Sequence, residues 1–414
     1  TCKFASEFDS MKYFNPTDSI YDITERFPVT LAIFISHGFS QMADESKRNT
    51  FGKALQFEIA VAMRQLDQQV FVEKLEAAIE SFGSSVKDPE KVYIKGLLPC
   101  PVRLPLQECL DEAIKNEETA GIAVQAELKA ASMGLGWMKE EVAKARDASE
   151  LDDIYISAGF DMFFDTAYFG RFIQSGAFSN PVPWKSVNPD FDQENFRLSD
   201  PKGRYGIIAV VPAVFLVNTE VLAGRAIPQS WKDLLDPMYE RSVSLPVADF
   251  DLFNAILLTI DNTYGPDAVR ALGRNMLKSL HPAQMVKSHS HKSDRPAITI
   301  MPYFFTKMVK EGGVMKAIWP KDGAIISPVF MIGKTAKPSV DRVSAIIAGE
   351  KVASILAHQG LFPSLHPDID NRLPESAGFL WIGWDYIDSH DLNKRFEACE
   401  ALFNESFVKE IVEL

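Results

Sequence analysis

From residue 92 onward, short apolar segments alternate with longer stretches of helical periodicity. Residues 154–157, 207–217 and 297–301 are among the apolar segments, and Pro212 divides the second of them into two predicted strands. This alternation is typical of α/β layers with mainly parallel sheets, because crossover helices cover the faces of buried strands. A chain of 414 residues also exceeds one ordinary core, so the sequence predicts two or three domains.

A separate helical segment precedes this region. Apolar residues recur at helical spacing after a turn and capping cluster at 15–19, and Gly38 is a candidate C-cap. The pattern ends at the polar stretch 82–89, which has the composition of a linker. We therefore expect a small all-helical domain over residues 1–86.

Charge and cysteine content limit the possible functions. The formal net charge is −13, whereas nucleic-acid binding needs clustered lysines and arginines, so no nucleic-acid partner is expected. The four cysteines, Cys2, Cys100, Cys109 and Cys399, contain no CxxC pair. They therefore indicate neither a disulfide framework nor a zinc site. No run of about 18 apolar residues occurs, so no membrane-spanning helix is predicted.

The start of the sequence carries no secretory signal, and this leaves two expectations open. In the first, the chain is a mature or trimmed form, and Cys2 is a remnant of a lipid-anchored start. In the second, the natural start lies near Met11 and the protein is never exported. Cysteine usage does not decide between these compartments.

The body carries a family resemblance in a series of short phrases. Segment 227–239, IPQSWKDLLDPMY, follows the strand-like segment FLVNT and precedes the predicted strand SVSLP. Segments 323–329 and 349–357 continue the same order. Together, over roughly residues 92–370, these phrases resemble solute-binding proteins of ABC-type importers, notably the ferric-iron branch. Within them, Trp231 is expected to be part of the packing face of a short helix.

The resemblance implies an α/β type II periplasmic-binding-protein fold, the two-lobed Venus flytrap, preceded by the small all-helical domain. Lobe one is expected to comprise residues 92–208 plus 312–414, and lobe two residues 209–311. The expectation is two lobes rather than one continuous sheet. The aromatic segment 378–385 lies outside the family pattern and is expected to be packed cover.

The N-terminal segment resembles a small helical domain of unknown function that is often found with redox or cluster proteins. The matching residues are Ile20, Asp22, Ile23, Phe27, Pro28, Ile33, Phe34, Gly38 and Phe39. A cysteine pair often follows this pattern, but residues 40–43 are Ser-Gln-Met-Ala here. The resemblance therefore implies a protein–protein contact rather than thiol or cluster chemistry.

In a two-lobed α/β fold the ligand lies at the carboxyl ends of strands and the N-termini of helices. This rule selects loops at residues 98–102, 157–161, 246–251 and 301–305. The ligand-binding residues expected there are Cys100, Ser157, Gly159, Phe160, Asp161, Asp249, Phe250, Asp251, Tyr303 and Phe304.

Tyr303 is the leading candidate metal ligand. The resemblance implies two adjacent tyrosines in this loop, because phenolate is a hard donor for Fe³⁺. Phe304 holds the second position, so the other expected oxygen donors are Asp161, Asp249 and Asp251. Helix capping by the aspartates and packing by Tyr303 are the alternatives. His289 and His291 form a His-x-His in a polar stretch that we expect to be an exposed loop.

The resemblance implies a binding protein rather than an enzyme, with no resident cofactor. Such a protein captures a small solute by hinge closure outside the cytoplasm and delivers it to the membrane subunits of an ABC importer. Ferric iron or another cation is one expected ligand, and an organic or phosphorylated anion is another. A cytoplasmic ligand sensor and a transferase that uses Cys100 as nucleophile, as in bacterial thiaminases, are the competing functions.

Overall fold

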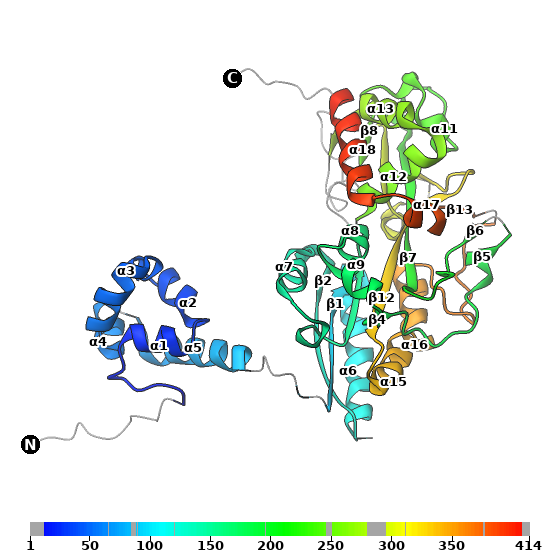
Figure 1. Ribbon diagram of the computed structural model, residues 1–414. Helices are drawn as coiled ribbons and strands as arrows, with labels where there is room; N and C mark the ends of the chain where they lie inside the picture. Colours follow the sequence, from blue (N-terminus) through cyan, green and yellow to red (C-terminus); the bar gives the residue numbers. More distant parts are fainter. Residues whose placement is uncertain are drawn as a thin grey trace, which may run out of the picture. The chain divides into compact units, whose positions relative to one another are not determined.

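The structure is a computed structural model, and its chain divides into two compact units, Thr1–Asp88 and Pro89–Leu414 (Figure 1). The residues that it describes are 12–64, 66–83, 88, 90–119, 121–194, 196–245, 251–279, 295–310, 312–375 and 377–407. No helix in these ranges is both long and apolar enough to cross a membrane.

The N-terminal unit is all helical, as its sequence predicts. Its helices are α1 (Ile20–Arg26), α2 (Thr30–Ser36), η1 (Ser40–Ala43), α3 (Glu45–Lys47), η2 (Arg48–Gly52), α4 (Phe57–Met63) and α5 (Gln68–Gly83). The side chain of Ser19 caps α1 by accepting a hydrogen bond from the main-chain N–H of Asp22. Phe34, Phe57 and Phe71 are buried and pack ring against ring at its centre. The unit thus has a core of its own.

A mixed β-sheet runs through the second unit. Among the residues that the structure describes, its main path has the strand order β2-β1-β3-β12-β7-β10-β8-β9. These strands are β1 (Lys91–Leu98), β2 (Ala123–Ala130), β3 (Ile154–Ala158), β7 (Gly206–Asn218), β8 (Val243–Leu245), β9 (Met276–Ser279), β10 (Ile298–Pro302) and β12 (Ala324–Lys334). Short strands β4 (Phe178–Ser179), β11 (Met315–Ile318) and β13 (Phe379–Leu380) extend it, and β5 (Asp192–Gln193) pairs with β6 (Phe196–Arg197) separately.

The two lobes are present, but the expectation that they do not share a continuous sheet needs correction. One hydrogen-bonded sheet connects both lobes. Strands β7 and β12 pair antiparallel, with β3 of lobe one on β12 and β10 of lobe two on β7. The 13 residues of β7 extend about 40 Å at the usual rise, which is enough to cross both lobes. The two long strands therefore form the connection between the lobes.

Strand β7 also continues through Pro212, where the sequence predicts a break. Val210 donates its main-chain N–H away from β12, to the carbonyl oxygen of Pro363. Because alternate residues of a strand face the same way, the nitrogen of Pro212 also points away from β12. The missing N–H of the proline therefore costs no hydrogen bond to β12.

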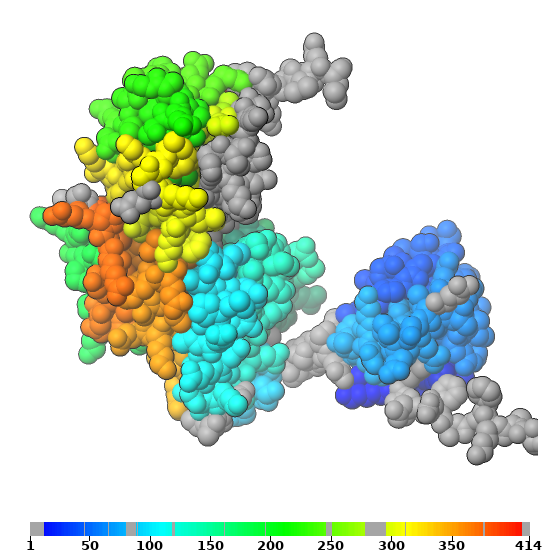
Figure 2. Space-filling model, turned by 180° about the vertical axis from the view of Figure 1, so that it is seen from behind, coloured from blue at the N-terminus to red at the C-terminus, as the bar shows by residue number. Residues whose placement is uncertain are grey.

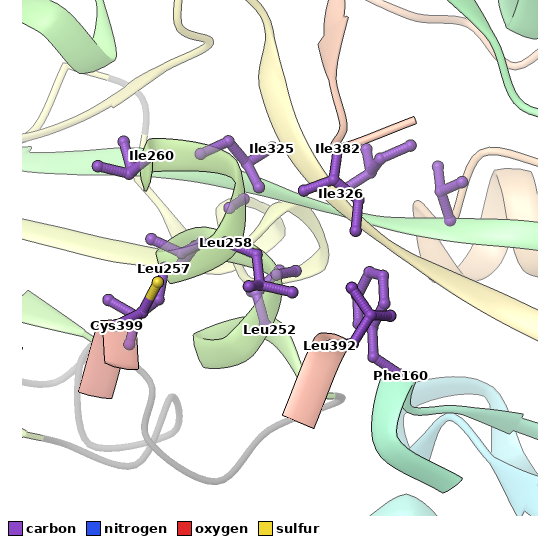
Figure 3. Packing of buried hydrophobic residues seen from close by; sticks show 14 of the residues in the cluster. Phe160, Leu252, Leu257, Leu258, Ile260, Ile325, Ile326, Ile382, Leu392 and Cys399 are labelled. Carbon is purple, nitrogen blue, oxygen red and sulfur yellow. The ribbon is translucent and has the colours of Figure 1, made fainter. Parts of the chain in front are cut away.

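Helices cover both faces of the sheet (Figure 1). In lobe one they are α6 (Arg103–Thr119), α7 (Gly136–Lys144), α8 (Phe160–Phe164), α9 (Phe169–Gln174), α15 (Pro338–Ile347) and α16 (Glu350–Ser354). In lobe two they are α10 (Thr219–Leu222), α11 (Trp231–Leu234), α12 (Leu252–Tyr264) and α13 (Pro266–Asn275). Helix α12 packs on β12, and its Leu258 belongs to the same buried cluster as Ile325 and Ile326 (Figure 3).

The C-terminal helix α18 (Leu392–Ser406) packs on lobe two, although the predicted boundaries place it in lobe one. Arg395 forms an ion pair with the buried carboxylate of Asp261 in α12. The ring of Phe403 lies 5.3 Å from that of Phe253. A buried carboxylate needs a cationic partner, and the partly buried ring of Phe253 packs against α18. These contacts bring the end of the chain back to lobe two.

The aromatic segment before α18 is packed cover, which confirms the prediction from sequence. The ring of Phe379 stacks on that of Phe191 at 4.9 Å. Trp384, which begins helix α17 (Trp384–Ser389), is buried, and its ring stacks on that of Tyr205 at 5.7 Å. Its indole N–H donates to the carbonyl oxygen of Leu198. The segment therefore seals the side of the sheet.

Candidate functional site

The loop after β1 contains Cys100, the first residue of helix η3 (Cys100–Val102). Cys100 is exposed, and its Sγ accepts a long hydrogen bond of 3.4 Å from the main-chain N–H of Ser132, in the short helix η4 (Ala131–Met133) after β2. Cys109 is a free thiol in α6. The contact of Cys100 that the structure describes is thus with a main-chain group and not with a general base.

The loop after β3 places its predicted residues mainly in the core. Ser157 is 1% exposed, and its hydroxyl donates to the carbonyl oxygen of Ala158. Gly159 has a φ of +147°, a conformation that favours glycine, and Phe160 then begins α8. The Phe160 side chain is fully buried and lies near Leu252 and Leu392 (Figure 3). The side chains of Ser157 and Phe160 are therefore part of the interior of the protein.

Asp251 brings two of the four predicted loops together. It precedes α12 in lobe two, and its Oδ2 accepts a hydrogen bond of 2.5 Å from the main-chain N–H of Phe160 in lobe one. Its Oδ1 accepts a hydrogen bond from the side-chain amide of Asn254. The backbone of Asp251 is left-handed, with a φ of +56°, which aspartate tolerates better than most residues. Asp251 therefore connects the start of α12 in lobe two to the start of α8 in lobe one.

Tyr303 begins helix η9 (Tyr303–Met308), directly after β10. Its ring is half-buried and lies 5.0 Å from that of Trp319, in an edge-on arrangement. Burial raises the pKa of the Tyr303 hydroxyl, because it disfavours the phenolate. The next residue, Phe304, stacks on Phe362 of lobe one, with 6.2 Å between the ring centres and 2° between the ring planes. Phe304, at the position where the resemblance implies a second tyrosine, thus makes an apolar contact between the lobes.

A second connection between the lobes lies beside Phe304 and has no counterpart in the sequence motifs. The ammonium group of Lys307 donates to the carbonyl oxygens of His358, at 3.1 Å, and Gln359, at 2.6 Å. These carbonyls end the π-helix η10 (Ile355–Gln359). Leu361 follows with a left-handed φ of +50°, which is unusual for a bulky residue. The only local signal is the Gly-Leu-Phe-Pro sequence at 360–363, which marks a turn without naming its partner.

Several predicted residues lie outside the described part of the chain. Asp249, Phe250, His289 and His291 fall in its gaps, and Asp161 is described only through its backbone in α8. Within the described ranges, no group of three or more histidine, cysteine, aspartate or glutamate residues could hold a metal ion. The metal-ligand set of Tyr303, Asp161, Asp249 and Asp251 therefore stays a prediction.

A polar hollow of about 580 Å³ lies elsewhere, between the α8–α9 region and the segment from α17 to α18. Asp165, Arg204, Asp388 and Lys394 are among its charged lining residues. Arg204 forms ion pairs with Asp200 and Asp388, which hold α17 against the start of β7. The charges of Arg204 and Asp388 are therefore already paired within the protein.

Comparison with known families gives this geometry its context. Residues 149–390, more than half of the chain, match the model for bacterial extracellular solute-binding proteins. The chain belongs to this family. Residues 14–72 of this solute-binding protein match a domain of unknown function (DUF1858), so both resemblances seen in the sequence are confirmed. No curated protein matches the sequence.

Solved structures similar to this solute-binding protein share its two-lobed fold at low identity. An ABC transporter protein from Clostridium perfringens is 15% identical, with a TM-score of 0.54, over 76% of this chain and 100% of that one. The apo ferric ion-binding protein A of Pasteurella haemolytica is 12% identical, with a TM-score of 0.52, over 78% and 100%. AfuA of Actinobacillus pleuropneumoniae, with fructose-6-phosphate bound, is 13% identical, with a TM-score of 0.50, over 77% and 99%. These likenesses establish the type II periplasmic-binding-protein fold of the body.

Proposed function

We propose that this protein is the solute-binding component of an ABC-type importer and captures a small solute between its lobes without chemical conversion. The observation that carries the proposal is that residues 149–390 match the solute-binding family. Within this range, two long paired strands, β7 and β12, join the lobes. Loops from both lobes meet beside these strands, through Asp251 and Phe160. Hinge motion about such a connection is the usual means of solute capture. The membrane subunits of the importer are the proposed partners, outside the cytoplasm.

The proposed solute is organic rather than a hard cation. Tyr303 packs against Trp319 and Phe304 against Phe362, so the loop that the resemblance assigns to a tyrosine pair is mainly apolar. The Asp251 carboxylate already accepts hydrogen bonds from two groups of the protein. A mostly apolar wall with a few convergent polar groups is typical of sites for small organic ligands.

Solute should raise the melting temperature of the protein in a concentration-dependent way. A ligand at about 100 times its dissociation constant adds about 2.7 kcal/mol to the free energy of unfolding, because it binds the folded state alone. The measurement is a thermal-shift panel of organic acids, sugar phosphates, amines and ferric citrate. A shift confined to one chemical class supports the proposal and identifies that class, whereas a panel without any shift contradicts solute capture.

Ferric citrate should produce no phenolate-to-iron absorption band with the ligand-free protein. The reason is that burial raises the pKa of Tyr303 and its ring packs on Trp319, so forming the phenolate is unfavourable. Visible spectroscopy on wild type and Tyr303→Phe tests this. The matched control is Tyr264→Phe, whose native hydroxyl donates to Asp322. A band that wild type and the control share, and that Tyr303→Phe lacks, would instead establish the metal alternative.

A transferase function is the competing proposal, and it depends on Cys100. Its described contact is the main-chain N–H of Ser132, which does not activate a thiol as a general base would. We therefore propose that the protein is not an enzyme. For the N-terminal unit, which has its own core, we propose a role in protein–protein contact.

A further inference from the structure

Lobe two places two side chains of opposite charge on main-chain groups of lobe one. The carboxylate of Asp251 accepts the N–H of Phe160, and the ammonium of Lys307 donates to the carbonyls of His358 and Gln359. Each pairing is a charge-assisted hydrogen bond, which is stronger than a neutral one. Figure 2 shows the yellow surface that contains η9 between the green surface of lobe two and the cyan and orange surface of lobe one.

The electrostatics of both contacts are favourable. The last carbonyl groups of a helix lack intrahelical partners and carry partial negative charge, so a lysine at the end of η10 satisfies them. The stacked rings of Phe304 and Phe362 lie next to this lysine and add an apolar contact. At the other contact, the negative charge of Asp251 meets a main-chain N–H donor at the start of α8.

The two contacts are attached to different hinge strands. Phe160 follows β3, which pairs with β12. The segment after η10 returns to the hinge at Ser364, which forms a bridge with Ala209 of β7. Two contacts on separate strands resist both opening and twisting of the lobes, whereas a single contact would act as a pivot. The left-handed backbones of Asp251 and Leu361 fit this arrangement, since uncommon backbone conformations persist where the surrounding structure holds them.

We infer that Asp251 and Lys307 are positioning residues that together set the angle between the lobes in the ligand-free protein. The inference rests on the proposed function, because the angle between lobes matters only to a protein that captures its solute by lobe motion. A solute that changes the angle must replace or move these contacts. Its apparent affinity is then lower than its intrinsic affinity, because only a fraction of the ligand-free molecules has the angle that the solute requires.

The test measures the distance between lobes in the full chain without solute. Genetically encoded spin labels replace two exposed residues, Glu112 in α6 and Asp267 in α13, and pulsed electron resonance gives the distance distribution. We expect one narrow distribution in wild type, broader ones in Asp251→Ala and Lys307→Met, and a shift to longer distances in the double variant. Lys310→Met, a nearby exposed lysine outside both contacts, should match wild type.

Two further measurements separate positioning from folding. Lys307→Arg should restore the narrow distribution, because it keeps the cation. Hydrogen exchange of the Phe160 amide should be about tenfold faster or more in Asp251→Ala, while amides in the β1 core keep their protection. Distributions of folded variants that coincide with wild type would overturn the inference. Because this measurement is made without solute, that result would not contradict solute capture. Conversely, a thermal-shift panel without any shift would not contradict the role of the two contacts in setting the angle between the lobes.

Discussion

Lys95→Met should lower the free energy of unfolding by about 3–5 kcal/mol, because it removes the cation beside the buried carboxylate of Asp152 and the partly buried carboxylate of Glu141. Lys95 is 8% exposed in β1, and its ammonium lies 3.0 Å from Asp152, 3.5 Å from Glu127 and in contact with Glu141. Asp152 is also buried. Urea denaturation followed by tryptophan fluorescence measures the loss.

The pH dependence of this effect has a defined sign. Burial by itself lowers the pKa of Lys95, but the charges of Asp152 and Glu141 outweigh it and raise that pKa. The resulting stabilisation is therefore present below the ordinary lysine pKa and is lost as the pH rises through the higher folded value.

Lys129→Met is the matched control for this prediction. Lys129 pairs with Glu127 at 2.8 Å, but both side chains are about a third exposed or more. Exposed pairs contribute about 1 kcal/mol or less. A loss in Lys95→Met no larger than that in Lys129→Met would contradict the role assigned to the buried cluster.

Trp231→Ala should destabilise the protein by about 3–5 kcal/mol, because it empties the centre of lobe two. Trp231 is fully buried, and its ring meets that of Phe215 edge-on at 4.9 Å. Its indole N–H donates to the carbonyl oxygen of Gly323, and its main-chain N–H donates to the carboxylate of Asp322. Thermal and urea unfolding of the variant measure the loss.

The contrast with a neighbouring residue makes this prediction specific. Met238 is 45% exposed in the same family phrase, and Met238→Ala should change the free energy of unfolding by about 0.5 kcal/mol or less. The loss of stability in Trp231→Phe should fall between those in Trp231→Ala and Met238→Ala, because phenylalanine keeps an aromatic ring but loses the indole hydrogen bond. Equal stability of Trp231→Ala and wild type would show that the phrase does not reflect packing.

Local patterns in the sequence determined the kinds of element and the family. Helical spacing around Ile20 and Ile23 predicted buried helix positions, and both residues are fully buried. The apolar run 154–157 predicted a buried strand, which β3 confirms. The IPQSWKDLLDPMY phrase predicted both the family and the packing role of Trp231. These features depend on near neighbours in the chain, because helix and strand periodicity arise within a few residues.

Only the tertiary structure decided which distant groups meet. Asp251 reaches Phe160 across 91 positions, and Lys307 reaches His358 across 51. In both pairs the partner atom belongs to the main chain, which every residue possesses, so the partner's sequence carries no signature of the contact. The position of α18 on lobe two likewise depends on the buried charge of Asp261. The sequence therefore predicted which loops are candidates for the site, while the path of the chain through both lobes decided how charged side chains connect the lobes.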